Sequence, residues 1–352
     1  MLPEFALERW LRAQEKRARL PIGGSGVAQG DLAPYLPADL AAAWRTHPDE
    51  AGRMLREAVA RQFGLAPERV LPAAGASEAD AAVVLGLAGP GAHVVVEKPA
   101  YHALIQPALA FGCRVSRVER GPDHALRAER VVEAIASGTK LVVLARPNNP
   151  TGAVVPAEDL RAIGDAAQRV GAWVLVDEVF ADATELGPPA ARIHPRLLSV
   201  NSVTKCLGFS GLRCGWVAGD PDALEAIDRA KSHLSVQNAL LDMQIAARVL
   251  DDRPKILGRT RATRGACAQV AAEFLEGARH VRGRVPEHGT TMLLKLPDGV
   301  DDLAFANTLA AEKGVVVPPG SYIEMPGHVR VGLVGDSEKL REGLRIVAAS
   351  LI

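Results

Sequence analysis

The alternation of short apolar runs with longer amphipathic stretches constrains the fold of this 352-residue chain more than any other feature. The runs are rich in Val, Leu and Ile, as buried strands are. They are VVVE (94–97), CRVSRV (113–118), KLVVLA (140–145), WVLVD (173–177), LLSVN (197–201) and GWVAG (215–219). Helical spacing of apolar residues is found in between, at 55–64, 128–136 and 157–171. This order predicts a mostly parallel sheet that is covered by helices on both faces.

The pattern divides the chain into two domains and an N-terminal segment. Residues 45–235 are expected to form the large domain, and residues 236–352 a smaller α+β domain. A long helical region is predicted at about 221–278, followed by short strands and a final helix; these strands are 291–296, 314–319 and 328–333, and the helix is 337–352. Residues 1–44 have too little pattern for a domain of their own. We expect them to pack beside the small domain or across a dimer interface.

Composition excludes several classes of partner. Lys and Arg total 41 and Asp and Glu total 41, so the net charge gives no reason to expect nucleic acid or a membrane surface as a partner. No apolar run reaches the roughly 18 residues that a membrane-spanning helix needs, and the charged first residues do not resemble a secretory signal. The four cysteines fit neither a disulfide framework nor zinc-ligand spacing, so a reducing, cytoplasmic setting without a metal is expected.

Lys205 lies in NSVTKCLGFSGLRCGW (201–216), just after a predicted strand and among small and apolar residues. A charged lysine is expensive to bury, so desolvation lowers its pKa and makes the amine a nucleophile. Ser202 and Arg213 flank it and suit a phosphate clamp, because arginine binds phosphate through two parallel hydrogen bonds. Taken alone, the segment is also consistent with a surface lysine in a Gly-rich loop.

Asp177 ends the apolar run WVLVD. It is therefore predicted at the carboxyl end of a parallel strand, where open α/β sheets bind ligands. A carboxylate there can pair with a pyridinium nitrogen and keep the ring protonated. Two other interpretations are a cap for the next helix and the metal-holding strand end of a nucleotide hydrolase. The second fails because the chain has no G-x-x-x-x-G-K-[ST] loop.

Two further segments place polar groups at strand ends. Asn149 in ARPNNPTGAVV (145–155) follows a predicted strand, so its amide could donate to a ring oxygen, although N-P-T-G is also ordinary turn chemistry. The turn Gly75–Ala76–Ser77 precedes a helix, and the N–H groups of a helix N-terminus bind phosphate.

Tyr101 and Arg330 complete the candidate site. Tyr101 in EKPAYHAL (97–104) could stack on a flat ring, or it could be an ordinary half-buried tyrosine. Arg330 lies in an alternating predicted strand, PGHVRVGL (326–333). It could bind a substrate carboxylate, or it could face solvent on an edge strand.

In this order and spacing, the segments resemble the aminotransferase class I/II family of pyridoxal-phosphate (PLP) enzymes, and the resemblance covers nearly the whole chain. Asp177 follows Asn149 by 28 residues, Lys205 follows after another 28, and Arg213 after eight more. The resemblance implies an α/β fold of fold type I, with a three-layer α/β/α large domain, a mostly parallel seven-stranded sheet and a smaller α+β domain. The stretch LERWLRAQEKRARLPIGGSGV (7–27) resembles a capreomycidine synthase-like branch of the family.

The resemblance also assigns roles. Lys205 matches the lysine that holds PLP as a Schiff base and moves the proton. Asp177 matches the partner of the pyridinium nitrogen, Asn149 the residue that bonds the ring hydroxyl, and Tyr101 the aromatic that stacks on the ring. The residues that match the phosphate site are Gly75, Ala76, Ser77, Ser202 and Arg213. Those that match substrate-binding positions are Arg330, Asn149 and, in the N-terminal region, Gly24 with Ser25.

The chain departs from the family pattern at two positions. Phe180 stands where the family usually has a tyrosine whose hydroxyl bonds the ring oxygen, and some decarboxylases of the family also have Phe there. His47, in THPDE (46–50), stands where a tyrosine often reaches the phosphate of the neighbouring subunit. Histidine can still bond phosphate, with a charge that depends on pH.

The resemblance implies a homodimer that transfers the amino group of an L-amino acid to a 2-oxo acid through the Lys205 Schiff base. The nearest alternative is a PLP-dependent decarboxylase, lyase or cyclase, since these reactions begin from the same external aldimine. A serine acyl-enzyme is another alternative, because S-V-T-K (202–205) matches S-x-x-K, but the chain has no K-T-G. A non-catalytic PLP-binding protein would lack a catalytic residue, and none is missing.

Overall fold

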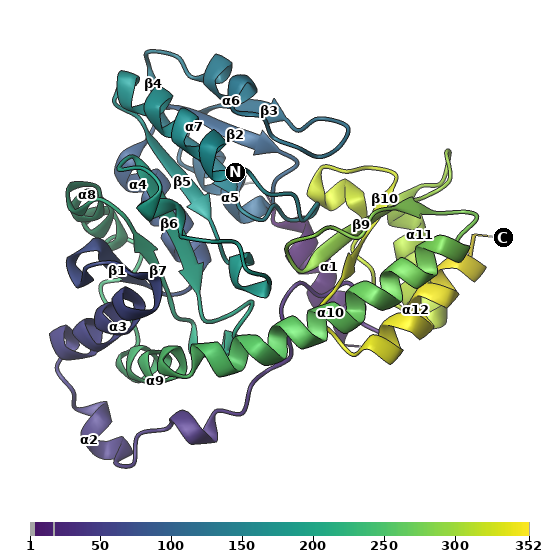
Figure 1. Ribbon diagram of the computed structural model, residues 1–352, viewed down its shortest axis with the longest axis horizontal. Coiled ribbons are helices and arrows are strands. Elements are labelled where there is room, and N and C mark those ends of the chain that lie inside the picture. Colours follow the sequence, from purple (N-terminus) through teal and green to yellow (C-terminus); the bar gives the residue numbers. More distant parts are fainter. Residues whose placement is uncertain (1–3, 17, 352) are drawn as a thin grey trace.

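The computed structural model describes residues 4–16 and 18–351, and a seven-stranded sheet lies at the centre of its larger part (Figure 1). The strand order is β1-β7-β6-β5-β4-β2-β3, and only β7 runs antiparallel to its neighbours. The strands are β1 (Val70–Ala73), β2 (His93–Lys98), β3 (Arg114–Glu119), β4 (Thr139–Ala145), β5 (Trp173–Asp177), β6 (Leu197–Ser202) and β7 (Gly215–Ala218). The predicted fold class, a mostly parallel seven-stranded sheet, is confirmed.

Helices cover both faces because residues along each strand point alternately to the two sides. In β4, Leu141 and Val143 join the apolar cluster of α4, α5 and α8, whereas Val142 and Leu144 join that of α6 and α7. These helices are α4 (Ala76–Leu87), α5 (His102–Ala110), α6 (Ala128–Ala134), α7 (Ala157–Val170) and α8 (Pro221–Lys231). Two further helices, α3 (Pro48–Phe63) and α9 (Leu240–Asp251), pack on one another at the β1 edge.

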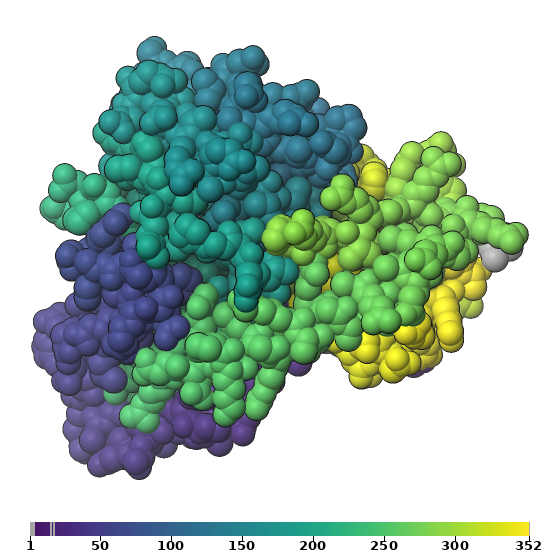
Figure 2. All heavy atoms as spheres, viewed as in Figure 1, coloured from purple at the N-terminus to yellow at the C-terminus, as the bar shows by residue number. Residues whose placement is uncertain are grey.

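A second, antiparallel sheet in the order β10-β9-β8 forms the smaller part. Its strands are β8 (Arg282–Gly283), β9 (Thr291–Lys295) and β10 (His328–Gly332). Its helices are α10 (Arg253–Gly277), α11 (Asp302–Thr308) and α12 (Ser337–Ala349). Helix α10 runs from α9 to this sheet and forms a continuous ridge along the surface (Figures 1 and 2).

The strand predicted at 314–319 is wrong. Val315 and Pro319 form only single bridges, to Leu20 and Val329 respectively. Pro318 and Pro319 have no backbone N–H, so the segment cannot donate a full ladder of hydrogen bonds.

The N-terminal residues lie along both parts. Helix α1 (Ala6–Glu15) lies between the two sheets (Figure 1), and Trp10 Nε1 donates a 2.8 Å hydrogen bond to Asn307. Helix α2 (Leu40–Trp44) lies beside α9, where Gln244 Nε2 donates to the carbonyl of Ala43 at 2.9 Å. The domain boundaries at 44 and 235 stay predictions. In the part of the chain that is described, no helix is both long and apolar enough to cross a membrane.

Candidate active site

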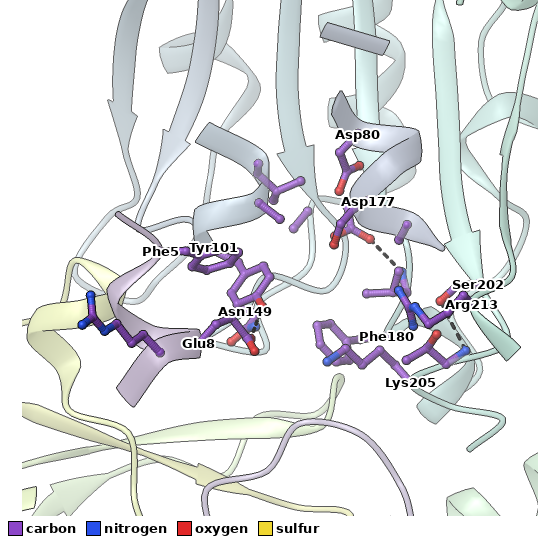
Figure 3. A pocket seen from close by; sticks show the side chains of 18 of the residues that line it. Phe5, Glu8, Asp80, Tyr101, Asn149, Asp177, Phe180, Ser202, Lys205 and Arg213 are labelled. Carbon is purple, nitrogen blue, oxygen red and sulfur yellow. Dashed lines mark hydrogen bonds between the residues drawn. The ribbon is translucent and has the colours of Figure 1, made fainter. Parts of the chain in front are cut away.

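A cavity of about 700 Å³ opens at the carboxyl ends of the parallel strands, between α1, α4 and α5 (Figure 3). Parallel strands end at the same edge of a sheet, which is why polar residues distant in sequence meet there. The predicted site residues in its wall are Ala76, Ser77, Tyr101, Asn149, Asp177, Ser202, Lys205 and Arg213. Gly75, Gly24 and Arg330 do not line it; Gly75 lies against Arg213 and Arg330 against Asn149, which do.

Lys205 follows β6, and its amine points into the cavity (Figure 3). Nζ donates a 3.2 Å hydrogen bond to Ser25 Oγ and lies 5.9 Å from the centroid of the Phe180 ring. Burial, and then the positive charge of Arg330, lower the pKa of Lys205. A larger share of the amine is therefore neutral and nucleophilic than in an exposed lysine.

Asp177 ends β5, the strand next to β6, and is buried. Burial raises the pKa of Asp177 to about 7, although the N–H of Val179 and the charge of Lys205 act in the opposite direction. The Val179 N–H donates to Oδ1 at 3.0 Å. A buried carboxylate with so few donors is stabilised by a cation brought beside it, and a pyridinium N–H is such a cation.

Asn149 meets Arg330 where the two parts of the molecule join. Both side chains are buried, and Arg330 Nη1 donates to Asn149 Oδ1 at 3.3 Å. Arg330 Nη2 also donates to the carbonyl of Gly23 at 3.0 Å. The alternative of a solvent-facing Arg330 is wrong, because the smaller sheet presses β10 against the N-terminal segment. Gly24 follows Gly23 and packs closely on Gly332. A Cβ added to Gly332 would lie 2.0 Å from the carbonyl oxygen of Gly24.

The loop that carries Asn149 is fixed by its neighbour Asn148. Asn148 Nδ2 donates to the carbonyl of Pro99 at 2.9 Å, and Oδ1 accepts from Thr151 Oγ1 at 2.7 Å. The segment N-P-T-G therefore forms a turn and also places the Asn149 amide at the cavity, so its two interpretations do not exclude each other.

A cradle that could hold an anion lies where α4 begins. Gly75 has a φ of +84°, and a Cβ there would come within 2.6 Å of Arg213 Nη2. Only glycine fits this position, and it leaves the first N–H groups of α4 facing the same space as the Arg213 guanidinium. Ser202 Oγ is nearby and accepts from the N–H of Thr204 at 3.3 Å. The N–H groups at the start of α4, the Arg213 guanidinium and the Ser202 hydroxyl together suit the phosphate of PLP.

Tyr101 connects the cavity to α1, a contact that the sequence did not reveal. Its hydroxyl donates to Glu8 Oε1 at 2.5 Å, and its ring lies 5.5 Å from that of Phe5. Burial raises the pKa of Tyr101, so the hydroxyl keeps its proton. Phe5 and Glu8 line the cavity together with Arg9 and Arg12. The amphipathic pattern of residues 6–15 was the available signal, but it does not say which surface the helix covers.

Asp80 on α4 is a second cavity residue that the sequence analysis missed. It is buried and lies beside Asp177 (Figure 3). The available signal was a lone carboxylate within an otherwise apolar stretch of helix, ADAAVVLGL.

The two departures from the family pattern lie in different places. Phe180 lines the cavity and faces Lys205, so this departure belongs to the site. His47 caps α3 by accepting from the N–H of Asp49 at 3.3 Å, and its side chain is exposed. A role for His47 in the site of a neighbouring subunit stays a prediction.

This sheet and cavity are those of a fold-type I PLP enzyme, and comparison with known proteins agrees. The model of the family described as "Aminotransferase class I and II" matches residues 48–347. The chain belongs to this family, whose members use PLP, and it is a PLP-dependent enzyme. The predictions of family and cofactor are confirmed.

Several curated relatives and solved structures are similar to the chain. Capreomycidine synthase from Streptomyces vinaceus is 30% identical, over 99% of this chain and 94% of that protein. Arginine–pyruvate transaminase from Pseudomonas aeruginosa is 31% identical, over 84% of this chain and 79% of that protein. A PLP-dependent aminotransferase from Streptococcus suis superposes with a TM-score of 0.89 at 26% identity, covering 99% of this chain and 98% of that chain.

Proposed function

We propose that the enzyme transfers the amino group of an L-amino acid to a 2-oxo acid, with Lys205 as the residue that binds PLP covalently and moves the proton. The observation that carries the proposal is the placement of Lys205 and Asp177 on adjacent strand ends, facing one cavity. When bound, PLP supplies an electron sink that stabilises negative charge on the α-carbon of the amino acid.

The remaining residues would hold the cofactor and the substrate in register. Asp177 would accept the ring N–H, and Asn149 would donate to the ring hydroxyl. Arg330 would pair with the α-carboxylate of the substrate, which fixes the α-carbon near Lys205 Nζ. That nitrogen would take the α-proton, a role that its lowered pKa supports because the neutral amine is the base.

The phosphate would lie in the cradle described above. The backbone N–H groups of Gly75, Ala76 and Ser77 would donate to it, with Ser202 and Arg213 from the other side. Tyr101 would stack on the ring. The positions of Ala76, Ser77, Tyr101, Ser202 and Arg213 at the cavity wall, and the closeness of Gly75 to Arg213, support these assignments.

Borohydride reduction tests the proposal. It should fix PLP on Lys205, as read by peptide mapping, and Lys205→Ala should abolish both the adduct and amino transfer while circular dichroism stays unchanged. Lys231→Ala is the matched control, because Lys231 is a buried lysine on α8 outside the cavity. An adduct on any other lysine contradicts the assignment.

One observation favours a second candidate function, in which the same cofactor chemistry leads to cyclisation or elimination. The similarity to capreomycidine synthase extends over 99% of the chain, and so includes α1, which lines the cavity. A panel of amino acids separates the two functions: transamination requires a 2-oxo acid acceptor and returns a 2-oxo acid from the donor, whereas cyclisation and elimination require no acceptor.

We also propose that the enzyme is a cytoplasmic homodimer. Support comes from large apolar side chains that are exposed around the start of α9: Leu40, Trp44, Leu234 and Val236. Large apolar side chains that gather on a surface are typical of protein interfaces. The four cysteines are all free thiols, which is consistent with a reducing compartment.

A further inference from the structure

Asp80 is a buried carboxyl group at the cavity to which the proposed function gives no role. Its side chain is only 2% exposed, and within the described chain Oδ1 has no hydrogen-bond partner. It faces the cavity beside Asp177 (Figure 3). Packing does not explain this residue, because an aliphatic side chain in the same place would avoid the cost of burying an unpaired polar atom.

The charges around the two carboxyl groups differ. Burial, and then the negative charge of Asp177, raise the pKa of Asp80. No charged side chain of α5 or α8, the described helices that flank α4, is among the groups that shift it. Among the described residues, the one charged group that shifts the pKa of Asp80 is therefore Asp177, which disfavours its ionised form.

The ionised form of Asp177 is better stabilised than that of Asp80. It has the Val179 N–H and the Lys205 amine, which oppose the effect of burial, while Glu178 and Glu97 raise its pKa further. Those two glutamates have cationic partners of their own, Arg146 and Arg120. Two neighbouring buried carboxyls resist ionising together, so the better supported one takes the charge.

We propose that Asp80 is a positioning residue that stays a neutral carboxylic acid, so that Asp177 alone carries the negative charge presented to the pyridine nitrogen of PLP. A neutral acid gives the Asp177 carboxylate a polar neighbour without adding a second negative charge. The inference rests on the proposed function, since it takes Asp177 as the group that faces the ring nitrogen.

Two substitutions separate this role from simple packing. Asp80→Asn keeps a polar group of the same shape that cannot ionise, whereas Asp80→Leu removes the polar neighbour and keeps the volume. We expect PLP binding to the cofactor-free protein, measured by equilibrium titration, to stay within about threefold of wild type for Asn. It should weaken by about tenfold for Leu, because an apolar neighbour offers the buried Asp177 carboxylate no polar group. Circular dichroism before the titration checks that both variants are folded.

Infrared spectroscopy provides a signature that packing alone would not change. The PLP-loaded wild type should show a protonated carboxylic acid C=O band at neutral pH, and this band should be absent from both variants. The inference is overturned if no such band is lost, which means that Asp80 is ionised. It is also overturned if Asn binds PLP as weakly as Leu, or if Leu binds as tightly as wild type.

Asp177→Asn distinguishes a failure of this inference from a failure of the proposed function. If PLP binds this variant as tightly as it binds the wild type, then Asp177 does not face the ring nitrogen. The inference about Asp80 and the proposed role of Asp177 are then both wrong. If the variant binds PLP weakly while the Asp80 variants behave alike, only the role of Asp80 is wrong.

Discussion

At the scale of single residues, Phe180 is the position where this enzyme departs most clearly from its family. A tyrosine hydroxyl there would bond the ring oxygen and so lower the pKa of the nitrogen that links PLP to the lysine. Phenylalanine cannot donate that hydrogen bond. Its ring lines the cavity, with the centroid 5.9 Å from Lys205 Nζ.

We expect Phe180→Tyr to lower the pKa of the linking nitrogen. One hydrogen bond to a charged group is worth about 1.5–3 kcal/mol, or roughly one to two pKa units. The wild type should therefore keep the linking proton to higher pH than the variant does in a spectrophotometric pH titration. Phe180→Leu, which also lacks a donor, should titrate like the wild type. Equal midpoints for Phe and Tyr would show that this position does not face the ring oxygen.

At the scale of elements, the N-terminus of α4 depends on one backbone conformation. Gly75→Ala should weaken PLP retention by roughly tenfold or more, because the left-handed φ is strained and the new methyl would displace Arg213. Dialysis against a cofactor-free buffer, followed by absorbance, measures the retention.

Gly89→Ala is the control for this substitution. Gly89 also has a positive φ, of +72°, but a Cβ there would meet nothing within 4 Å. It should reduce thermal stability and leave PLP retention unchanged. Equal PLP loss in both variants would mean that backbone strain alone, rather than the cradle, accounts for the effect.

Elements with a continuous apolar run were predictable from sequence, and contacts between distant elements were not. The run KLVVLA is long enough and apolar enough to specify β4, whereas the apolar GVVVPP ends in two prolines that prevent pairing. The candidate ring and phosphate residues could be predicted because most of them lie at or just after strand ends. Glu8 and Asp80 were missed because their importance depends on Tyr101 and Asp177, which lie 93 and 97 positions further along the chain.

At the scale of the whole molecule, the exposed apolar side chains around the start of α9 are expected to meet a second copy of the chain. Trp44 is 72% exposed and Val236 is 90% exposed. Burial of one large apolar side chain stabilises an interface by about 1.5–3 kcal/mol. Trp44→Glu should therefore weaken the dimer by about tenfold or more, as measured by sedimentation velocity over a dilution series.

Leu109→Glu is the matched control, since Leu109 is 43% exposed but lies on α5, away from this surface. It should leave the mass unchanged. A wild type that sediments as a monomer would show that there is no such interface. A dimer that only Leu109→Glu dissociates would show that the interface lies elsewhere.

The position of α1 has a consequence for how such an enzyme acquires a new substrate. The residues proposed to hold PLP lie within the span that the family model matches, 48–347, whereas α1 lies before it. Helix α1 nevertheless provides Glu8, Arg9 and Arg12 to the cavity wall, together with Phe5 just before it. Part of the cavity wall and the residues proposed to hold PLP thus lie in separate stretches of the sequence. We expect an exchange of α1 between homologues, as in a chimera, to alter which amino acid is admitted while every residue proposed to hold PLP keeps its identity.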